Sequence, residues 1–267
     1  MAYDLDPALA PDPKHSPDPA SPLAFLLLVE RFYASVIRHA QSAENGLGGW
    51  LLYVGEMDEN GRALMVAANI AGAASLDVSA DSVAQKQSIH DGVADFLVTD
   101  LSEALRILKN EIRKREPVAV CVAAQPAFIE QEMLERGVLP DLVRELDFGS
   151  APDSTRAALT FGDSPVLVAP IGPAQNESLI TWSVDEAPAQ WLPRLDVIAM
   201  DYLAPDQSAS AQVARRWLHL APRYMGRLAR NVRVLRCSTP AANRIAQRMR
   251  AGVASGEIPI VVRIDFI

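Results

Sequence analysis

The chain has 267 residues, of which 49% are hydrophobic and 22% are charged, and its formal net charge is -8. This length and composition predict one or two globular domains with an ordinary core, and exclude a disordered, collagen-like or coiled-coil protein. The acidic balance argues against a nucleic-acid-binding surface over the whole protein.

Only two cysteines occur, Cys121 and Cys237, both inside apolar runs. Two cysteines cannot build a disulfide framework or a four-cysteine zinc site, so we expect buried, inert thiols and no metal. No apolar run approaches the ~20 residues that a membrane-spanning helix needs. The expected location is the cytoplasm.

Residues 1–22 are rich in proline and aspartate. Proline lacks an amide donor and the carboxylates repel one another, so this segment is expected to be a disordered tail. The alternative is an acidic arm that docks on a basic face.

From residue 23 onward, segments with helical spacing alternate with short apolar runs of strand length. The expected helices are 23–42, 63–70, 80–90, 102–113 and 126–135. The expected strands are 50–54, 74–78, 95–98, 117–122 and 140–143, with a tight turn at 58–61. Strands without polar alternation, each followed by a helix, indicate a mostly parallel sheet covered on both faces. The predicted fold is a Rossmann-like three-layer α/β/α domain over 23–150.

A polar, turn-rich linker at 147–164 precedes a second, smaller α/β flank over 165–267. Its expected strands are 166–169, 179–182, 232–236 and 258–266, and its expected helices are 208–228 and 240–251. The stretch 186–200 stays ambiguous because Pro188 and Pro193 interrupt it.

Three blocks of the chain resemble the urocanases (urocanate hydratases). The first reads GLGGWLLYVGEMDENGRALMVAANIAGAASLDVS, the second contains ERGVLPDLV, and the third reads NRIAQRMRAGVASGEIPIVVRIDF. The first aligns with the family's strand, glycine-rich loop and helix. The resemblance implies a Rossmann-like domain that holds NAD, and an activity that adds water to urocanate. The family's N-terminal catalytic part is not among the matched blocks.

The resemblance places the NAD-binding positions at Asn60, Gly61, Ser79 and Gln125. A phosphate-binding loop needs small residues whose amides approach the pyrophosphate, yet Asp58 and Glu59 bring two negative charges to that place. Ser79 stands where the family has an acid, and a serine cannot accept hydrogen bonds from both ribose hydroxyls. We therefore expect these positions to be non-functional and no cofactor to bind, with NAD as the alternative. The family's catalytic cysteine falls near Ala174 or Gln175, so no catalytic residue is expected.

A basic segment stands out in this acidic protein. Between Asp206 and Glu257 there is no Asp or Glu, but there are ten arginines. Arginine suits bidentate contacts with carboxylates or phosphates, so this segment is either a binding surface or the internal counterpart of the acidic half. The candidate anion- or partner-binding residues are Arg215, Arg216, Arg223, Arg227 and Arg230.

These observations favour a non-catalytic binding or assembly module derived from urocanase. The alternatives are an NAD-dependent hydratase-type lyase and a subunit of a larger complex whose missing core comes from another chain. We expect a homo-oligomer or a protein partner, and neither a membrane nor a nucleic acid.

Overall fold

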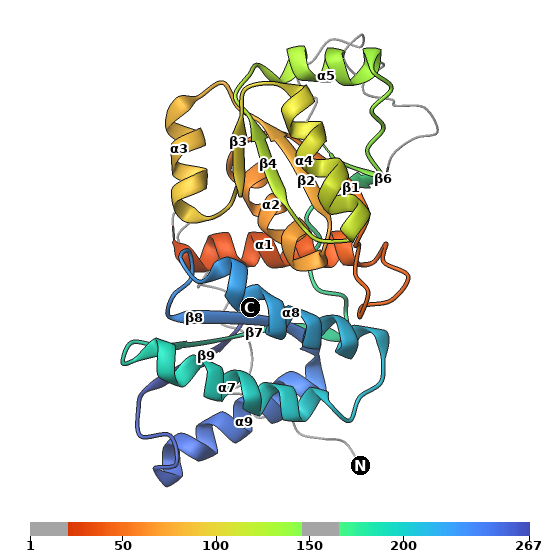
Figure 1. The fold of residues 1–267 in the computed structure, drawn as a ribbon. Helices are drawn as coiled ribbons and strands as arrows, with labels where there is room; N and C mark the ends of the chain where they lie inside the picture. Colours follow the sequence, from red (N-terminus) through yellow and green to blue (C-terminus); the bar gives the residue numbers. More distant parts are fainter. Residues whose placement is uncertain (1–20, 146–165) are drawn as a thin grey trace. The chain divides into compact units, whose positions relative to one another are not determined.

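The computed structural model describes residues 21–145 and 166–267 (Figure 1). The predicted linker at 147–164 and nearly all of the predicted tail lie outside these residues. The chain divides into two compact units, Arg31–Ile171 and Met1–Glu30 with Gly172–Ile267. The division falls within helix α1, Pro22–Ile37. None of the described helices is long and apolar enough to cross a membrane.

The unit Arg31–Ile171 holds a six-stranded sheet in the order β3-β4-β2-β1-β5-β6. Every neighbouring pair of its strands is parallel. Its strands are β1 (Leu51–Glu56), β2 (Ala74–Val78), β3 (Phe96–Val98), β4 (Ala119–Val122), β5 (Leu142–Arg144) and β6 (Val166–Val168). Its other helices are α2 (Glu59–Ala71), α3 (Ser82–Asp91), α4 (Leu101–Lys114) and α5 (Pro126–Glu135). The predicted Rossmann-like α/β fold is confirmed.

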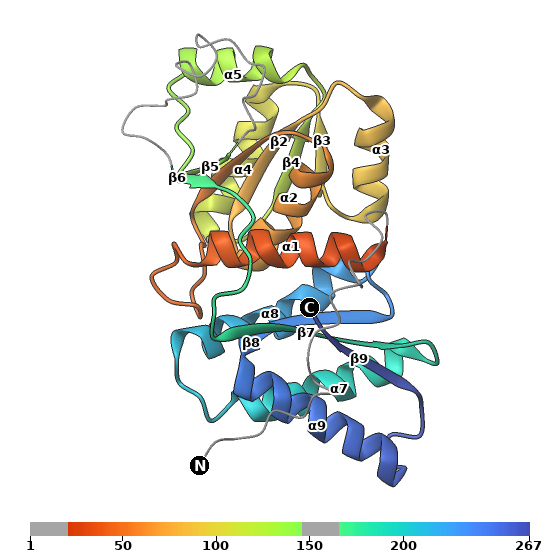
Figure 2. The ribbon, with the colours of Figure 1, turned by 180° about the vertical axis from the view of Figure 1, so that it is seen from behind.

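Helices cover both faces of this sheet. On one face, Leu101 and Leu108 of α4 and Met133 of α5 pack with Leu76 and Val120 of the central strands in one buried cluster. Helix α2 packs on β1 and β2, and the view from behind shows it in front of the sheet (Figure 2). Burial on both faces explains why these strands read as continuous apolar runs.

Aspartates begin three of the helices that follow a strand. The side chains of Asp58, Asp81 and Asp100 accept hydrogen bonds from backbone amides in the first turns of α2, α3 and α4, at 2.7, 2.8 and 2.9 Å. An aspartate at this position satisfies an amide that would lack a partner and favours the positive end of the helix dipole. The predicted turn at 58–61 is therefore wrong, because α2 already begins at Glu59.

The unit with Gly172–Ile267 has a three-stranded antiparallel sheet in the order β8-β7-β9. Its strands are β7 (Glu177–Val184), β8 (Val232–Ser238) and β9 (Val262–Phe266). Its helices are α7 (Pro188–Leu203), α8 (Ala209–Met225) and α9 (Thr239–Ser255). The ambiguous stretch 186–200 is mostly helix, with Pro188 in the first turn and Pro193 inside. The predicted smaller flank is confirmed as a small antiparallel sheet with helices, but the strand expected in it at 166–169 is β6 of the parallel sheet.

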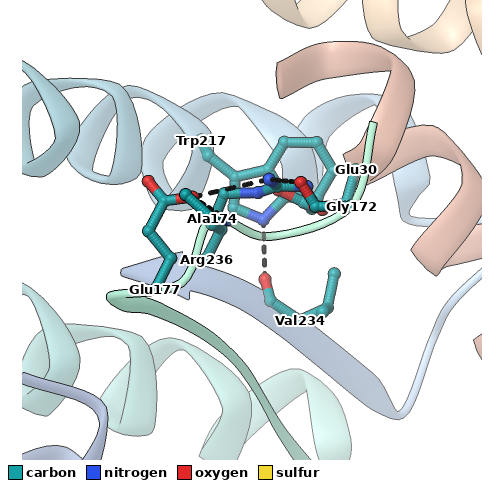
Figure 3. Close-up of polar contacts among 7 residues, drawn as sticks. All are labelled: Glu30, Gly172, Ala174, Glu177, Trp217, Val234 and Arg236. Carbon is teal, nitrogen blue, oxygen red and sulfur yellow. Dashed lines mark hydrogen bonds and ion pairs between the residues drawn. The ribbon is translucent and has the colours of Figure 1, made fainter. Parts of the chain in front are cut away.

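A buried ion pair joins the first half of α1 to this second sheet. Arg236 donates two hydrogen bonds to the carboxylate of Glu30, at 2.7 and 2.9 Å, and a third to the carbonyl of Gly172 at 2.7 Å (Figure 3). Glu177 lies 3.6 Å from the same guanidinium. The Glu30 side chain is only 2% exposed, so its charge depends on Arg236 for compensation.

Candidate functional site

The carboxyl ends of the parallel strands form the edge where open α/β sheets bind ligands, above all where the strand order reverses. In this sheet β2 lies on one side of β1 and β5 on the other, so the reversal falls between β1 and β5. Two charged residues meet there. Arg144 ends β5, and Asp58 follows the last residue of β1 by two positions.

Asp58 and Arg144 form an ion pair at the amino end of α2. The Nη1 atom of Arg144 donates to Oδ1 of Asp58 at 2.5 Å and to the carbonyl of Glu56 at 3.2 Å. The same Asp58 oxygen accepts the amide of Gly61 at 2.7 Å. The Arg144 side chain is 7% exposed and that of Asp58 is 50% exposed. A carboxylate of the chain itself thus binds the helix amide and the guanidinium, the two groups that attract an anion.

Gly61 lies in contact with protein atoms at this corner. A β-carbon at Gly61 would lie 2.4 Å from the Glu56 carbonyl oxygen, 3.0 Å from Nη1 of Arg144 and 3.3 Å from Oδ1 of Asp58. The space that glycine leaves is therefore filled by the strand end and the ion pair. The neighbouring Asn60 is exposed in the first turn of α2.

Ser79 and Gln125 lie at the same edge and are separately engaged. The Ser79 hydroxyl accepts the amide of Asp81 at 3.2 Å, and its carbonyl accepts the side chain of Gln85 at 2.7 Å. Ser79 is buried, whereas Gln125 is exposed before Pro126 and makes no side-chain cap to α5. The topology therefore brings Asn60, Gly61, Ser79 and Gln125 to one edge of the sheet.

Residues 30–155 match the family model described as the urocanase Rossmann-like domain. This part of the chain is therefore similar to the urocanase Rossmann-like domain. The match begins within α1 and spans the parallel sheet from β1 to β5. The resemblance in the sequence is thereby confirmed for this part of the chain.

The start of α2 in this urocanase-like domain is already engaged by a carboxylate of the domain itself. The pyrophosphate of a dinucleotide would need the amides at the start of α2, which Asp58 already binds. A phosphate placed there would also meet the Asp58 carboxylate at close range, and like charges at about 4 Å repel by on the order of 1–4 kcal/mol in exposed to partly exposed surroundings. Ser79 offers no carboxylate for the ribose. The mismatch with a phosphate arises because the Asp58 carboxylate is already bound at the start of α2.

A second acid is buried next to this corner. Asp77 on β2 is fully buried, and neither carboxyl oxygen accepts a hydrogen bond from an N–H or O–H group of the described residues. Burial raises the pKa of Asp77 to about 8, although the Cys121 thiol and the Arg144 guanidinium lower it in part. The carboxyl group is therefore largely protonated at neutral pH.

Neither cysteine has the environment of a nucleophile. Cys121 and Cys237 are both buried free thiols. Burial and the nearby Asp77 raise the pKa of Cys121, and burial with Glu177 raises that of Cys237 to about 12. The prediction of buried thiols is confirmed. Among the described residues there is also no group of three His, Cys, Asp or Glu side chains that could hold a metal ion.

The five arginines predicted as a binding surface lie on α8 and the loop after it. Arg215 donates to the carbonyls of Leu203 and Asp206, both at 2.6 Å, and so binds the end of α7. Arg216 is half-buried. The three remaining members, Arg223, Arg227 and Arg230, are exposed.

Sequence reasoning missed Arg144 and Asp77. Each is the only ionisable side chain in its strand, which reads LVR for β5 and ASLDV for β2. An ionisable residue inside a mostly apolar run was therefore the signal that could have found them. Such residues are rarely buried unless they are paired or neutralised. Arg144 is paired with Asp58, and Asp77 is neutralised by its raised pKa.

Proposed function

We propose that this protein is a non-catalytic binding or assembly module built on a urocanase Rossmann-like domain. The observation that carries the proposal is the Asp58–Arg144 ion pair at the start of α2. In this pair the Asp58 carboxylate binds the Gly61 amide and the Arg144 guanidinium, the two groups that a dinucleotide phosphate would need. Loss of the NAD electrophile removes the group on which the family's hydration of urocanate depends.

The cysteine environments support the same proposal. Water addition needs positioned acid–base groups and charge stabilisation, which supply most of an enzyme's rate. Ala174, near the family's catalytic cysteine position, offers no nucleophile, and its amide donates to Glu177 at 3.0 Å. Two buried thiols also agree with a reducing compartment, and we place the protein in the cytoplasm.

The module is expected to act through a second copy or a protein partner. A partner chain could also supply a catalytic core, which is the alternative in which this protein is a subunit of a larger complex. Native mass spectrometry of freshly purified protein separates these cases, because it reports bound small molecules and assembly mass together. A mass increment matching NAD would contradict the proposal.

The activity test follows urocanate by its absorbance in the presence of protein and added NAD. We expect no loss above the protein-free background. Turnover that Gln125→Ala abolishes would instead support the hydratase alternative. Because Gln125 is exposed and caps nothing with its side chain, this substitution tests ligand contact without disturbing the fold.

A further inference from the structure

The chain contains two Asn–Gly pairs, Asn45–Gly46 and Asn60–Gly61. In both pairs a glutamate precedes the asparagine, and both asparagines are exposed. Glycine has no side chain to shield its amide nitrogen and allows the widest range of backbone angles. An Asn–Gly pair is therefore well suited to deamidation, in which the glycine nitrogen attacks the asparagine side chain. The two pairs differ in the structures that hold them.

Deamidation replaces ammonia by water. The glycine nitrogen loses its proton and forms a bond with the side-chain carbonyl carbon of the asparagine, and the bond from that carbon to the side-chain nitrogen breaks to release ammonia. Water then opens the five-membered imide at either carbonyl and gives aspartate or isoaspartate. The attack requires the glycine nitrogen to turn toward the asparagine side chain, which takes the asparagine out of the helical backbone angles.

Asn60–Gly61 lies in the first turn of α2, where the reacting nitrogen is held in place. The Gly61 amide donates to the Asp58 carboxylate at 2.7 Å, and the Arg62 amide donates to the Asp58 carbonyl at 2.9 Å. Rotation of the peptide between Asn60 and Gly61 would break the first of these bonds. The Asp58 carboxylate also opposes the negative charge that the nitrogen acquires when it loses its proton. Both effects slow the reaction at Asn60.

Asn45–Gly46 lies in the turn after α1, in a segment that is neither helix nor strand. The Gly46 amide donates to an uncharged acceptor, the carbonyl of Ser42, at 3.1 Å. The Asn45 amide donates to the Ser42 hydroxyl at 3.2 Å. An exposed turn of this kind opens at a lower free energy than the start of a helix that packs on a buried sheet. The nitrogen of Gly46 therefore reaches the Asn45 side chain more often than the nitrogen of Gly61 reaches that of Asn60.

We propose that Asn45 is a deamidation site of this chain and that the Asp58 cap protects Asn60 from the same reaction. The inference is independent of the proposed function. The isoaspartate product carries an extra backbone carbon, which at Asn60 would lie directly before the Gly61 amide and would disrupt the start of α2. The same change at Asn45 alters only a turn and adds one negative charge. The cap therefore preserves the edge of the sheet where the candidate site lies.

Ageing of the purified full-length protein at neutral pH, followed by peptide mapping, tests the proposal. Trypsin releases both asparagines in one peptide, residues 39–62, and fragmentation in the mass spectrometer assigns each conversion to its residue. We expect Asn45 to convert faster than Asn60 by at least about fivefold, the factor that corresponds to a helix cap of about 1 kcal/mol. In urea-unfolded protein the two rates should be similar, because the sequence Glu–Asn–Gly is common to both sites.

Two variants without a helix cap assign the protection to Asp58. Asp58→Ala should raise the native rate at Asn60, relative to its rate in urea, by at least about fivefold and leave Asn45 unchanged. Asp100→Ala removes the equivalent cap from α4, where Asp100 accepts the Glu103 amide at 2.9 Å, and should leave both rates unchanged.

The wild-type comparison decides the proposal even if Asp58→Ala fails to fold. Similar native rates at Asn45 and Asn60 would overturn it. So would a native protein in which Asn45 does not convert while the urea-unfolded chain does, or equal acceleration of Asn60 by the two variants.

Discussion

Arg144, the last residue of β5, donates a 2.5 Å hydrogen bond to Asp58, the residue that caps α2. The bond spans the point between β1 and β5 where the strand order reverses. In dinucleotide-binding relatives of this fold, a ligand phosphate occupies that point. Here the carboxylate of Asp58 supplies the negative charge that the helix end and the guanidinium attract.

Removal of the Asp58 carboxylate should destabilise the domain. Asp58→Ala loses the helix cap and leaves the buried Arg144 without its carboxylate, so the free energy of unfolding should fall by about 1–3 kcal/mol. Asp58→Asn should cost less, because an amide oxygen can still accept the Gly61 amide. Urea unfolding of the two variants checks the order, and equal stability of Asp58→Ala and wild type would contradict the structural role.

Gly61→Ala tests how closely the corner is packed. Alanine favours a helix interior over glycine by about 1 kcal/mol. The new β-carbon would nevertheless lie 2.4 Å from the Glu56 carbonyl, and relief of such a contact costs about 1–3 kcal/mol. We expect a net loss of stability. Gly172→Ala is the matched control, since a β-carbon there meets no atom within 4 Å. A higher free energy of unfolding for Gly61→Ala than for wild type would show that the space beside Gly61 is open.

Asp77→Asn should change the pH dependence of stability. The folded-state pKa of Asp77 is about 8, above its ordinary value of 3.8. The folded chain therefore holds this proton more tightly, and wild type loses stability as the pH rises from about 4 to about 8, by at most about 1.4 kcal/mol per pH unit. The stability of the variant relative to wild type should grow across this window and level off above it.

Thermal melts of both proteins from pH 4 to pH 9 measure this difference. Only the slope is diagnostic, because the asparagine amide is itself buried and adds a cost that does not depend on pH. A constant difference across the range would mean that Asp77 is ionised in the folded protein.

Glu30→Gln should strongly destabilise the unit that contains β7 to β9. Its side chain is 2% exposed, and breaking a buried pair by neutralising one partner costs about 3–5 kcal/mol. The exposed pair of Arg263 with Asp185 is the matched control, and Asp185→Asn should cost no more than about 1 kcal/mol. Denaturant midpoints of the two variants make the comparison, and similar midpoints would refute the buried role of Glu30.

Local patterns predicted most elements because each strand and helix follows from a short stretch of sequence. The strand 74–78 and the helix 126–135 agree with β2 and α5 at both ends. The predicted end of the first helix is wrong by several residues, since α1 ends at Ile37 and not at 42. The last strand begins at Val262 rather than at 258, because Ile258 is buried and its amide donates to Gly252 at 3.0 Å.

The candidate site depends on partners far apart in the sequence. The acidic character of Asp58 was visible, and it predicted a poor phosphate site. Its partner Arg144 could not be predicted from the sequence, because 86 residues separate Asp58 from Arg144. Only the adjacent positions of β1 and β5 in the sheet bring the two residues together. The Asn60–Gly61 pair suggested an ordinary turn, although an aspartate three positions before a glycine amide is also a helix start.

Calorimetric titration of the wild-type protein with NAD tests the central claim most directly. The Asp58–Arg144 pair must be displaced before a pyrophosphate can reach the α2 amides, so we expect a dissociation constant weaker than ~1 mM, equivalent to only about -4 kcal/mol. Saturable binding with a micromolar dissociation constant would contradict the account.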